Sequence, residues 1–208
     1  MRYAANASVV ALAALLAAGT AQAAFVIGVT GTPGSGQTTW TFSGSSTVGG
    51  GTITIDDDDD NISWGWIVGT AFYSGTNINI DFSSTNAILS DGTTTYDIVG
   101  IGATLLDPNK AFGIAIEDAG ASSDSYSFAG GTVLSFAGSA IAPLDFGDLN
   151  EGANSVSEWG DYTENVQGTL PGTINVGDVS TTPVAPTLTL TSLGIAGLAG
   201  VRRRRRSG

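Results

Sequence analysis

The hydrophobic positions of this chain fall into short runs, and clusters of Gly, Ser, Asn and Asp separate these runs. The clearest run covers residues 77–82, where polar and apolar residues alternate as they do in a half-buried strand. The separating clusters consist of the residue types that form turns. The pattern therefore predicts strands over residues 25–30, 39–42, 52–55, 62–68, 77–82, 95–106, 111–116, 132–137 and 173–179.

Strands of this length and spacing favour an all-β protein with a single antiparallel β-sandwich or jelly-roll-like domain. The composition agrees, because Gly contributes 30 of 208 residues and the helix-favouring charged residues are few. No repeat of fixed period is present, which disfavours a solenoid or propeller. Two apolar terminal segments do not follow this strand pattern, and we expect them to form an N-terminal signal helix and a short C-terminal transmembrane helix.

Residues 1–23 have the features of a secretory signal peptide in the usual order. Arg2 gives a positively charged n-region, residues 9–18 form an apolar h-region, and Ala21 and Ala23 form a small-x-small cleavage site. The sequence therefore predicts an exported protein whose mature chain begins at Ala24 or Phe25. The alternative for this segment is a buried core helix.

The other apolar segment, residues 186–201, ends at the cluster Arg202, Arg203, Arg204, Arg205 and Arg206. Such a cluster stays on the cytoplasmic side of a membrane. As a helix the segment would span about 24 Å, slightly less than a hydrocarbon core of ~30 Å. We thus expect a domain over residues 24–172, a Thr/Pro-rich linker over 173–185, a marginal transmembrane segment and a cytoplasmic tail over 202–208.

This tail resembles the sorting tail of PEP-CTERM proteins. The resemblance is carried by the tetrapeptide Pro183, Val184, Ala185 and Pro186, by the apolar run containing Gly-Leu-Ala-Gly, and by the arginine cluster. The family motif is Val-Pro-Glu-Pro, so this chain lacks the Glu and has its first Pro one position earlier. The resemblance implies a bacterial protein held briefly in the inner membrane, cleaved by an exosortase and sorted to the cell surface or an exopolysaccharide matrix. The alternative is a plain membrane anchor.

The charge between the two terminal segments is strongly negative. Residues 24–182 hold all nineteen acidic residues and a single basic one, Lys110, for a formal charge of −18. A body of this charge repels nucleic acid and anionic membrane surfaces, so nucleic acid is excluded as a partner. The chain has no cysteine, so its stability must come from an ordinary apolar core.

The segment from Gly31 to Thr38 fits the phosphate-loop pattern G-x-x-x-x-G-K-[ST], except that Gln37 replaces the Lys. That Lys supplies the positive charge opposite the phosphates, and a neutral Gln cannot supply it. The acidic body and the lack of alternating strands and helices also argue against a nucleotide. We expect a Gly/Ser hairpin loop here.

The acidic run Asp56, Asp57, Asp58, Asp59 and Asp60 must connect two strands, because adjacent carboxylates repel each other and do not fit within one. Calcium prefers such hard oxygen ligands in loops, but the spacing is not that of a helix-loop-helix calcium site. The run is therefore either a solvated acidic turn or a calcium site, and calcium is the only cofactor that the sequence suggests. A second oxygen-rich group consists of Asp145, Asp148, Asn150 and Glu151.

Trp64 and Trp66 are two positions apart, so on a strand they share one face with Val68. Facing inward, this face would be a layer of the core. Facing outward, it would be a flat aromatic platform for sugar rings, and the chain would be a carbohydrate-binding module.

Paired carboxylates around Trp159, including Glu151, Glu158, Asp161 and Glu164, could also hydrolyse a glycosidic bond. Such clusters arise easily by chance in so acidic a chain. Without His or Cys, the usual general base and the thiol nucleophile are missing. We therefore predict no catalytic residues and a non-enzymatic surface or biofilm-matrix protein. An extracellular polysaccharide is a candidate partner, and the carbohydrate-binding module and the carboxylate glycosidase are the alternatives.

Overall fold

A computed structural model of the chain describes residues 24–57, 63–68, 78–104, 111–118, 125–161 and 165–177. These residues form thirteen strands and one short 3-10 helix. In chain order they are β1 (Phe25–Gly31), β2 (Thr38–Thr47), β3 (Ile53–Asp56), β4 (Trp64–Ile67), β5 (Ile78–Asp81), β6 (Ser84–Thr85), β7 (Ile88–Ser90), β8 (Thr95–Thr104), β9 (Ala111–Glu117), β10 (Ser125–Phe128), β11 (Val133–Ala142), η1 (Phe146–Asp148), β12 (Gly152–Asp161) and β13 (Val166–Val176). Within the described ranges, no helix has the length and apolar character needed to cross a membrane.

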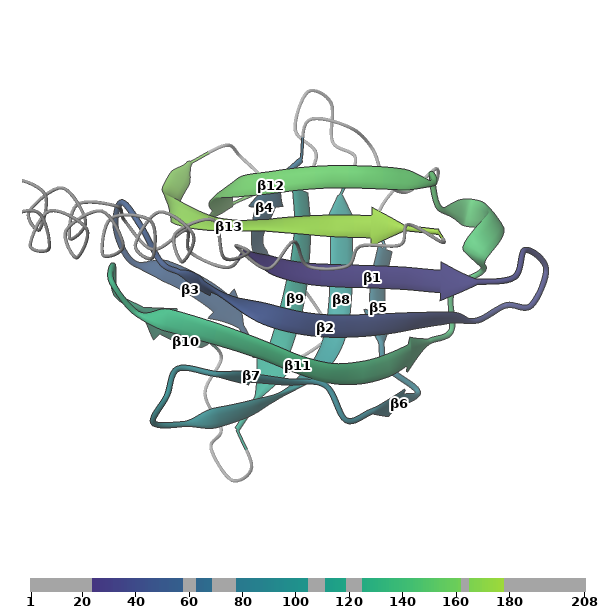
Figure 1. Ribbon diagram of the computed structural model, residues 1–208, viewed down its shortest axis with the longest axis horizontal. Coiled ribbons are helices and arrows are strands. Elements are labelled where there is room, and N and C mark those ends of the chain that lie inside the picture. Colours follow the sequence, from purple (N-terminus) through teal and green to yellow (C-terminus); the bar gives the residue numbers. More distant parts are fainter. Residues whose placement is uncertain are drawn as a thin grey trace, which may run out of the picture.

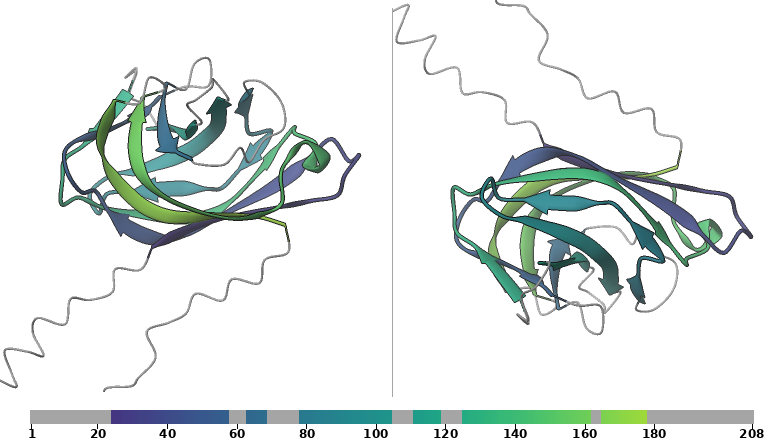
Figure 2. Two further views of the ribbon diagram at one scale, coloured as in Figure 1. Left: turned by 90° about the horizontal axis from the view of Figure 1, so that it is seen from above. Right: turned by 90° about the horizontal axis from the view of Figure 1, so that it is seen from below.

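Nine of these strands pair in a closed ring, in the order β1, β2, β11, β7, β8, β9, β4, β12 and β13. The ring closes between the first and last strands of the domain, because β1 lies parallel to β13 with Phe25 opposite Gly172. In Figure 1, β1, β2, β11, β12 and β13 run along the long axis, and β8 and β9 cross behind them. Figure 2 shows the sheet curling around its interior. The domain is a closed β-barrel.

The all-β prediction is confirmed, but the pairings correct the expected sandwich. A sandwich would consist of two separate sheets, whereas here one continuous sheet closes on itself. Short runs of alternating residues predict strands equally well for both architectures, because each has one face toward the core. The expected flanking helices lie outside the described residues.

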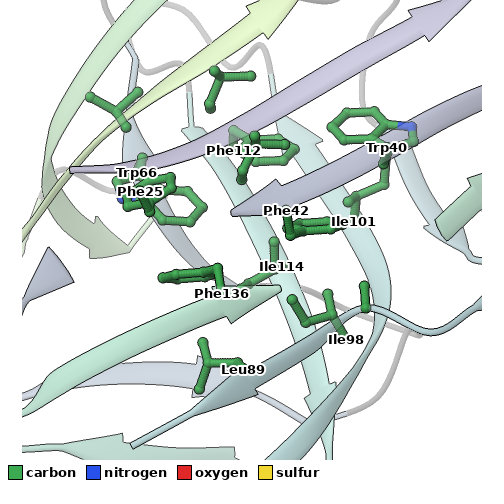
Figure 3. Packing of buried hydrophobic residues seen from close by; sticks show 14 of the residues in the cluster. Phe25, Trp40, Phe42, Trp66, Leu89, Ile98, Ile101, Phe112, Ile114 and Phe136 are labelled. Carbon is green, nitrogen blue, oxygen red and sulfur yellow. The ribbon is translucent and has the colours of Figure 1, made fainter. Parts of the chain in front are cut away.

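The strands form where the sequence alternates. In β1 the side chains of Phe25 and Val29 are buried, and in β2 those of Trp40 and Phe42 are buried between exposed threonines. These inward side chains meet in a single core cluster, part of which Figure 3 shows. Burial of large apolar side chains is the main favourable contribution to folding, so this cluster holds the barrel together.

Aromatic rings form the centre of this core. The ring of Phe112 is stacked against both Trp40 and Trp66, with centroids 5.8 Å apart in each pair. Trp66 also meets Trp159 edge to face at 4.6 Å and lies 4.9 Å from Phe25. These rings come from five different strands, so they tie the crossing walls of the barrel to each other.

One wall of the barrel carries no charge. The strands β1, β2, β11 and β13 contain no acidic or basic residue, although the body as a whole is strongly acidic. Exposed positions on β2 include small hydroxyl residues such as Thr39 and Thr41, whereas β11 exposes Ser135 together with the apolar side chains of Val133 and Ile141. The acidic residues of the described ranges therefore lie on the other strands and on the connections.

Several strands are not evident, or only partly evident, from the residue pattern. The strand β12 and the first half of β13 have few large apolar residues, yet they pair with each other over most of their length. Strand β13 continues to Val176, so residues 173–176 belong to the domain and not to the expected linker over 173–185. Tertiary pairing stabilises strands that local preference alone does not specify.

Candidate functional site

The acidic run begins inside the sheet, which corrects the expectation that all five carboxylates lie on an exposed connection. Asp56 is the last residue of β3 and is only 8% exposed. Its Oδ2 accepts hydrogen bonds from the backbone N–H groups of Ser63, at 2.5 Å, and Trp64, at 3.0 Å. Burial raises the pKa of Asp56, and these two hydrogen bonds oppose the rise. This carboxylate therefore joins β3 to the start of β4.

The structure describes Asp57 but not Asp58, Asp59 or Asp60, which lie outside the described residues. In the part of the chain that it does describe, no three His, Cys, Asp or Glu side chains are grouped closely enough to hold a metal ion. The calcium hypothesis for the whole run stays a prediction.

Trp66 points into the core. Its side chain is 0% exposed, and its Nε1–H donates to the carbonyl oxygen of Leu170 at 2.8 Å. Figure 3 shows it beside Phe25 in the interior. Trp64 is partly buried and packs against the same cluster. This placement favours the core interpretation of the pair, because a ligand cannot reach Trp66 in a closed barrel.

The carboxylates suggested for glycoside hydrolysis are spread along β12. Glu151 precedes the strand and Asp161 ends it, so the length of the strand separates them by roughly 30 Å. Asp161 accepts hydrogen bonds from the backbone N–H and the side-chain amide of Asn165, at 3.0 and 2.9 Å. Glu158 is exposed on the strand, and Glu164 lies outside the described residues. Glu151 and Asp161 therefore cannot act on the same bond.

The loop that resembles a phosphate loop surrounds a carboxylate of the protein itself. The Oδ1 of Asp145 accepts from the N–H of Gly34 at 3.0 Å, and its Oδ2 accepts from the N–H of Gly36 at 2.9 Å. Both glycines have positive φ, which turns their N–H groups toward one point. Asp145 also caps η1 by accepting from the N–H of Gly147 at 2.7 Å. We call this arrangement the Asp145 bracket.

The Asp145 bracket explains why the phosphate-loop pattern does not make a phosphate site. The backbone donors that would hold a phosphate already bind a fixed negative charge, which would also repel a second anion. The bracket joins residues that are 109 and 111 positions apart in the chain. It fixes the tip of the β1–β2 hairpin against η1.

The Asp145 bracket predicts a specific pH dependence of stability. Its three backbone hydrogen bonds lower the pKa of Asp145 below the ordinary value of 3.8. The stabilisation is therefore fully present above pH 3.8 and is lost as the pH falls through the folded-state pKa. We expect Asp145→Ala to lower the melting temperature at pH 7. We also expect the difference in melting temperature between this variant and the unchanged protein to shrink toward zero as the pH is lowered below 3.8. Thermal unfolding followed by circular dichroism at several pH values measures this difference. A difference that stays constant with pH would contradict this assignment.

A cavity of about 270 Å³ opens beside the bracket at this end of the barrel. Its lining comes from the end of β1, the hairpin loop, η1, the residue before β12 and the residue after β13: Thr30, Gly31, Pro33, Phe146, Glu151 and Gly177. Pro33 and Phe146 supply apolar surface, and Glu151 is the only charged residue among the described residues of this lining. The Glu151 side chain lies against Gly177.

The sequence pattern indicates Glu151 as part of an oxygen-rich group and the hairpin loop as a separate motif, without a link between the two. Thr30, Phe146 and Gly177 were not recognised as site residues. No sequence signal could have revealed them, because the cavity exists only where the two ends of the domain meet the middle of the chain.

The predicted processing residues lie outside the described residues. These are Ala21 and Ala23 at the signal cleavage site, Pro183, Val184, Ala185 and Pro186 in the sorting motif, and Arg202, Arg203, Arg204, Arg205 and Arg206 in the tail. Comparison of the chain with protein-family models, with curated proteins and with solved structures gives no match.

Proposed function

We propose that this chain is an exported bacterial surface or extracellular-matrix protein that is sorted through its PEP-CTERM-like tail and has no enzymatic activity. The observation that carries the proposal is the order of segments along the chain. A signal peptide comes first, a body of charge −18 follows, and a Pro-containing tetrapeptide, an apolar run and five arginines end the sequence. In this scheme an exosortase-type enzyme removes the tail at the inner membrane.

The start of the folded domain is compatible with the expected signal cleavage. Strand β1 begins at Phe25, whose side chain is fully buried between Trp66 and Phe136. Cleavage after Ala23 keeps this ring in the mature protein. Cleavage a few residues later would remove a large core side chain from the strand that closes the barrel.

The charge distribution supports a matrix role rather than an enzymatic one. The acidic residues would keep the protein soluble and attract cations, while the uncharged wall of β1, β2, β11 and β13 offers Ser and Thr hydroxyls. Hydroxyl groups on a neutral surface can hydrogen-bond to neutral polysaccharide. The whole chain lacks His and Cys, which removes the commonest groups for acid–base and nucleophilic catalysis.

The aromatic-platform version of a carbohydrate-binding module has less support. Trp40, Trp66 and Trp159 are each 0% exposed, and Trp64 is partly buried against the core. None of the four tryptophans of the chain presents a fully open ring face. A contact with polysaccharide would therefore have to use other groups of the barrel.

The mature C-terminus tests the proposal directly. We expect terminal-peptide mass spectrometry of the native protein to find a terminus between residues 183 and 187, without the arginine cluster. The double variant Pro183→Ala/Pro186→Ala should keep its tail and stay in the membrane fraction, and the matched control Thr181→Ala/Thr182→Ala should be processed normally. An intact tail in the unchanged protein would show a simple membrane anchor and would refute sorting by this route.

A further inference from the structure

We propose that the cavity at the end of the barrel binds a small hydroxylated amine of the hexosamine class, with Glu151 as the counter-ion of its ammonium group. The proposal extends the matrix function, and it rests on that function for the choice of a sugar as the ligand. Amino sugars combine one positive charge with an apolar ring face and several hydroxyl groups. The cavity lining has a counterpart for each of these features.

The size and surface of the cavity suit one sugar ring. Its volume of about 270 Å³ is slightly below the usual range of about 300–1,000 Å³ for small-molecule sites, so the cavity is too small for a long ligand. Pro33 and Phe146 contribute apolar atoms to the lining, which can contact the C–H groups of a ring. Thr30 and Glu151 are its polar lining residues, with a hydroxyl and a carboxylate as side-chain groups. A sugar likewise combines apolar C–H surface with polar hydroxyl groups.

The charge around the cavity selects a cation. All seven basic residues of the chain lie outside the described ranges, so no Lys or Arg of the described part can neutralise Glu151. The neighbouring carboxylate of Asp145 already accepts three backbone hydrogen bonds. Glu151, whose side chain is exposed, is therefore the carboxylate among the described lining residues that can pair with a ligand. An ammonium group in the cavity would form a charge-assisted hydrogen bond with this carboxylate.

The walls of the cavity are held in place before a ligand arrives. The Asp145 bracket binds the loop that carries Pro33 and also caps η1, which carries Phe146. On a third side, the N–H of Gly177 donates to the carbonyl oxygen of Val29 at 2.8 Å. Fixed walls reduce the entropy that is lost on binding, so even a small ligand can bind measurably.

Titration of the full chain in mild detergent with glucosamine tests the proposal by NMR and calorimetry. We expect saturable binding, with shifts that centre on Thr30, Gly31 and Gly177. Glucose lacks the ammonium group and N-acetylglucosamine has its charge removed, so neither should bind. The variant Glu151→Gln should weaken glucosamine binding by about tenfold or more, as expected for the loss of a hydrogen bond between charged groups. The control Glu158→Gln, exposed on β12, should bind as the unchanged protein does.

Three results would overturn the proposal. The first is the absence of saturable glucosamine binding. The second is an equal loss of glucosamine affinity in the Glu151→Gln and Glu158→Gln variants, which would show general attraction of cations to an acidic surface. The third is equally tight binding of putrescine, which would show that the sugar ring contributes nothing. None of these results depends on the processing of the C-terminus, so this test and the sorting test fail independently.

Discussion

Replacing Trp66 by Ala is expected to remove a large part of the protein's free energy of unfolding. The indole is fully buried and contacts Phe25, Phe112 and Trp159, and its N–H donates to the Leu170 carbonyl. Truncating a buried Trp to Ala typically costs about 3–5 kcal/mol of unfolding free energy. Domains of this size are stable by only about 5–15 kcal/mol, so the loss is a large part of the total.

Urea unfolding followed by tryptophan fluorescence and near-ultraviolet circular dichroism would measure this loss. The matched control is Trp64→Ala, which removes the same side chain two positions earlier from a partly buried site. We expect the control to cost clearly less and to keep a cooperative transition. If Trp66→Ala left the stability unchanged while Trp64→Ala reduced polysaccharide binding, the core placement of Trp66 would be wrong and the platform interpretation would gain support.

The second large effect is expected for Gly172→Ala, at the pair of strands that closes the barrel. Gly172 lies opposite Phe25 in the parallel pairing of β13 with β1, and a Cβ atom added there would overlap the Phe25 ring. That ring is fully buried between Trp66 and Phe136, so it has little room to move. Forcing extra atoms into a packed core typically costs about 1–3 kcal/mol and sometimes more.

Thermal unfolding of Gly172→Ala would show this effect as a lower melting temperature. The control is Gly28→Ala in the same β1 strand, where the added Cβ would meet the side-chain hydroxyl of the exposed Thr41 rather than a buried ring. We expect a smaller loss for the control, because a surface side chain can adjust. Equal losses for the two variants would mean that the cost comes from replacing a strand glycine and not from the Phe25 ring.

The sequence by itself determined the class of the fold and part of its strand map. Alternation in β5 and in the first strand is visible in the residues, because inward and outward positions on a strand need opposite polarity. The exposed Gly/Ser loop after β1 was also predictable from its turn-forming residues. The acidity of the body and the order of the terminal segments are properties of the sequence alone.

Only the tertiary structure decided how these strands close and which residues meet. Closure depends on Phe25 packing over Gly172, and the bracket depends on Asp145 reaching Gly34 across 111 positions of chain. The direction of the Trp66 ring was likewise open, because one strand face can be core or surface according to what packs on it. Local residue preferences specify a strand and its two faces, whereas burial and pairing between distant segments specify the barrel and the cavity at its end.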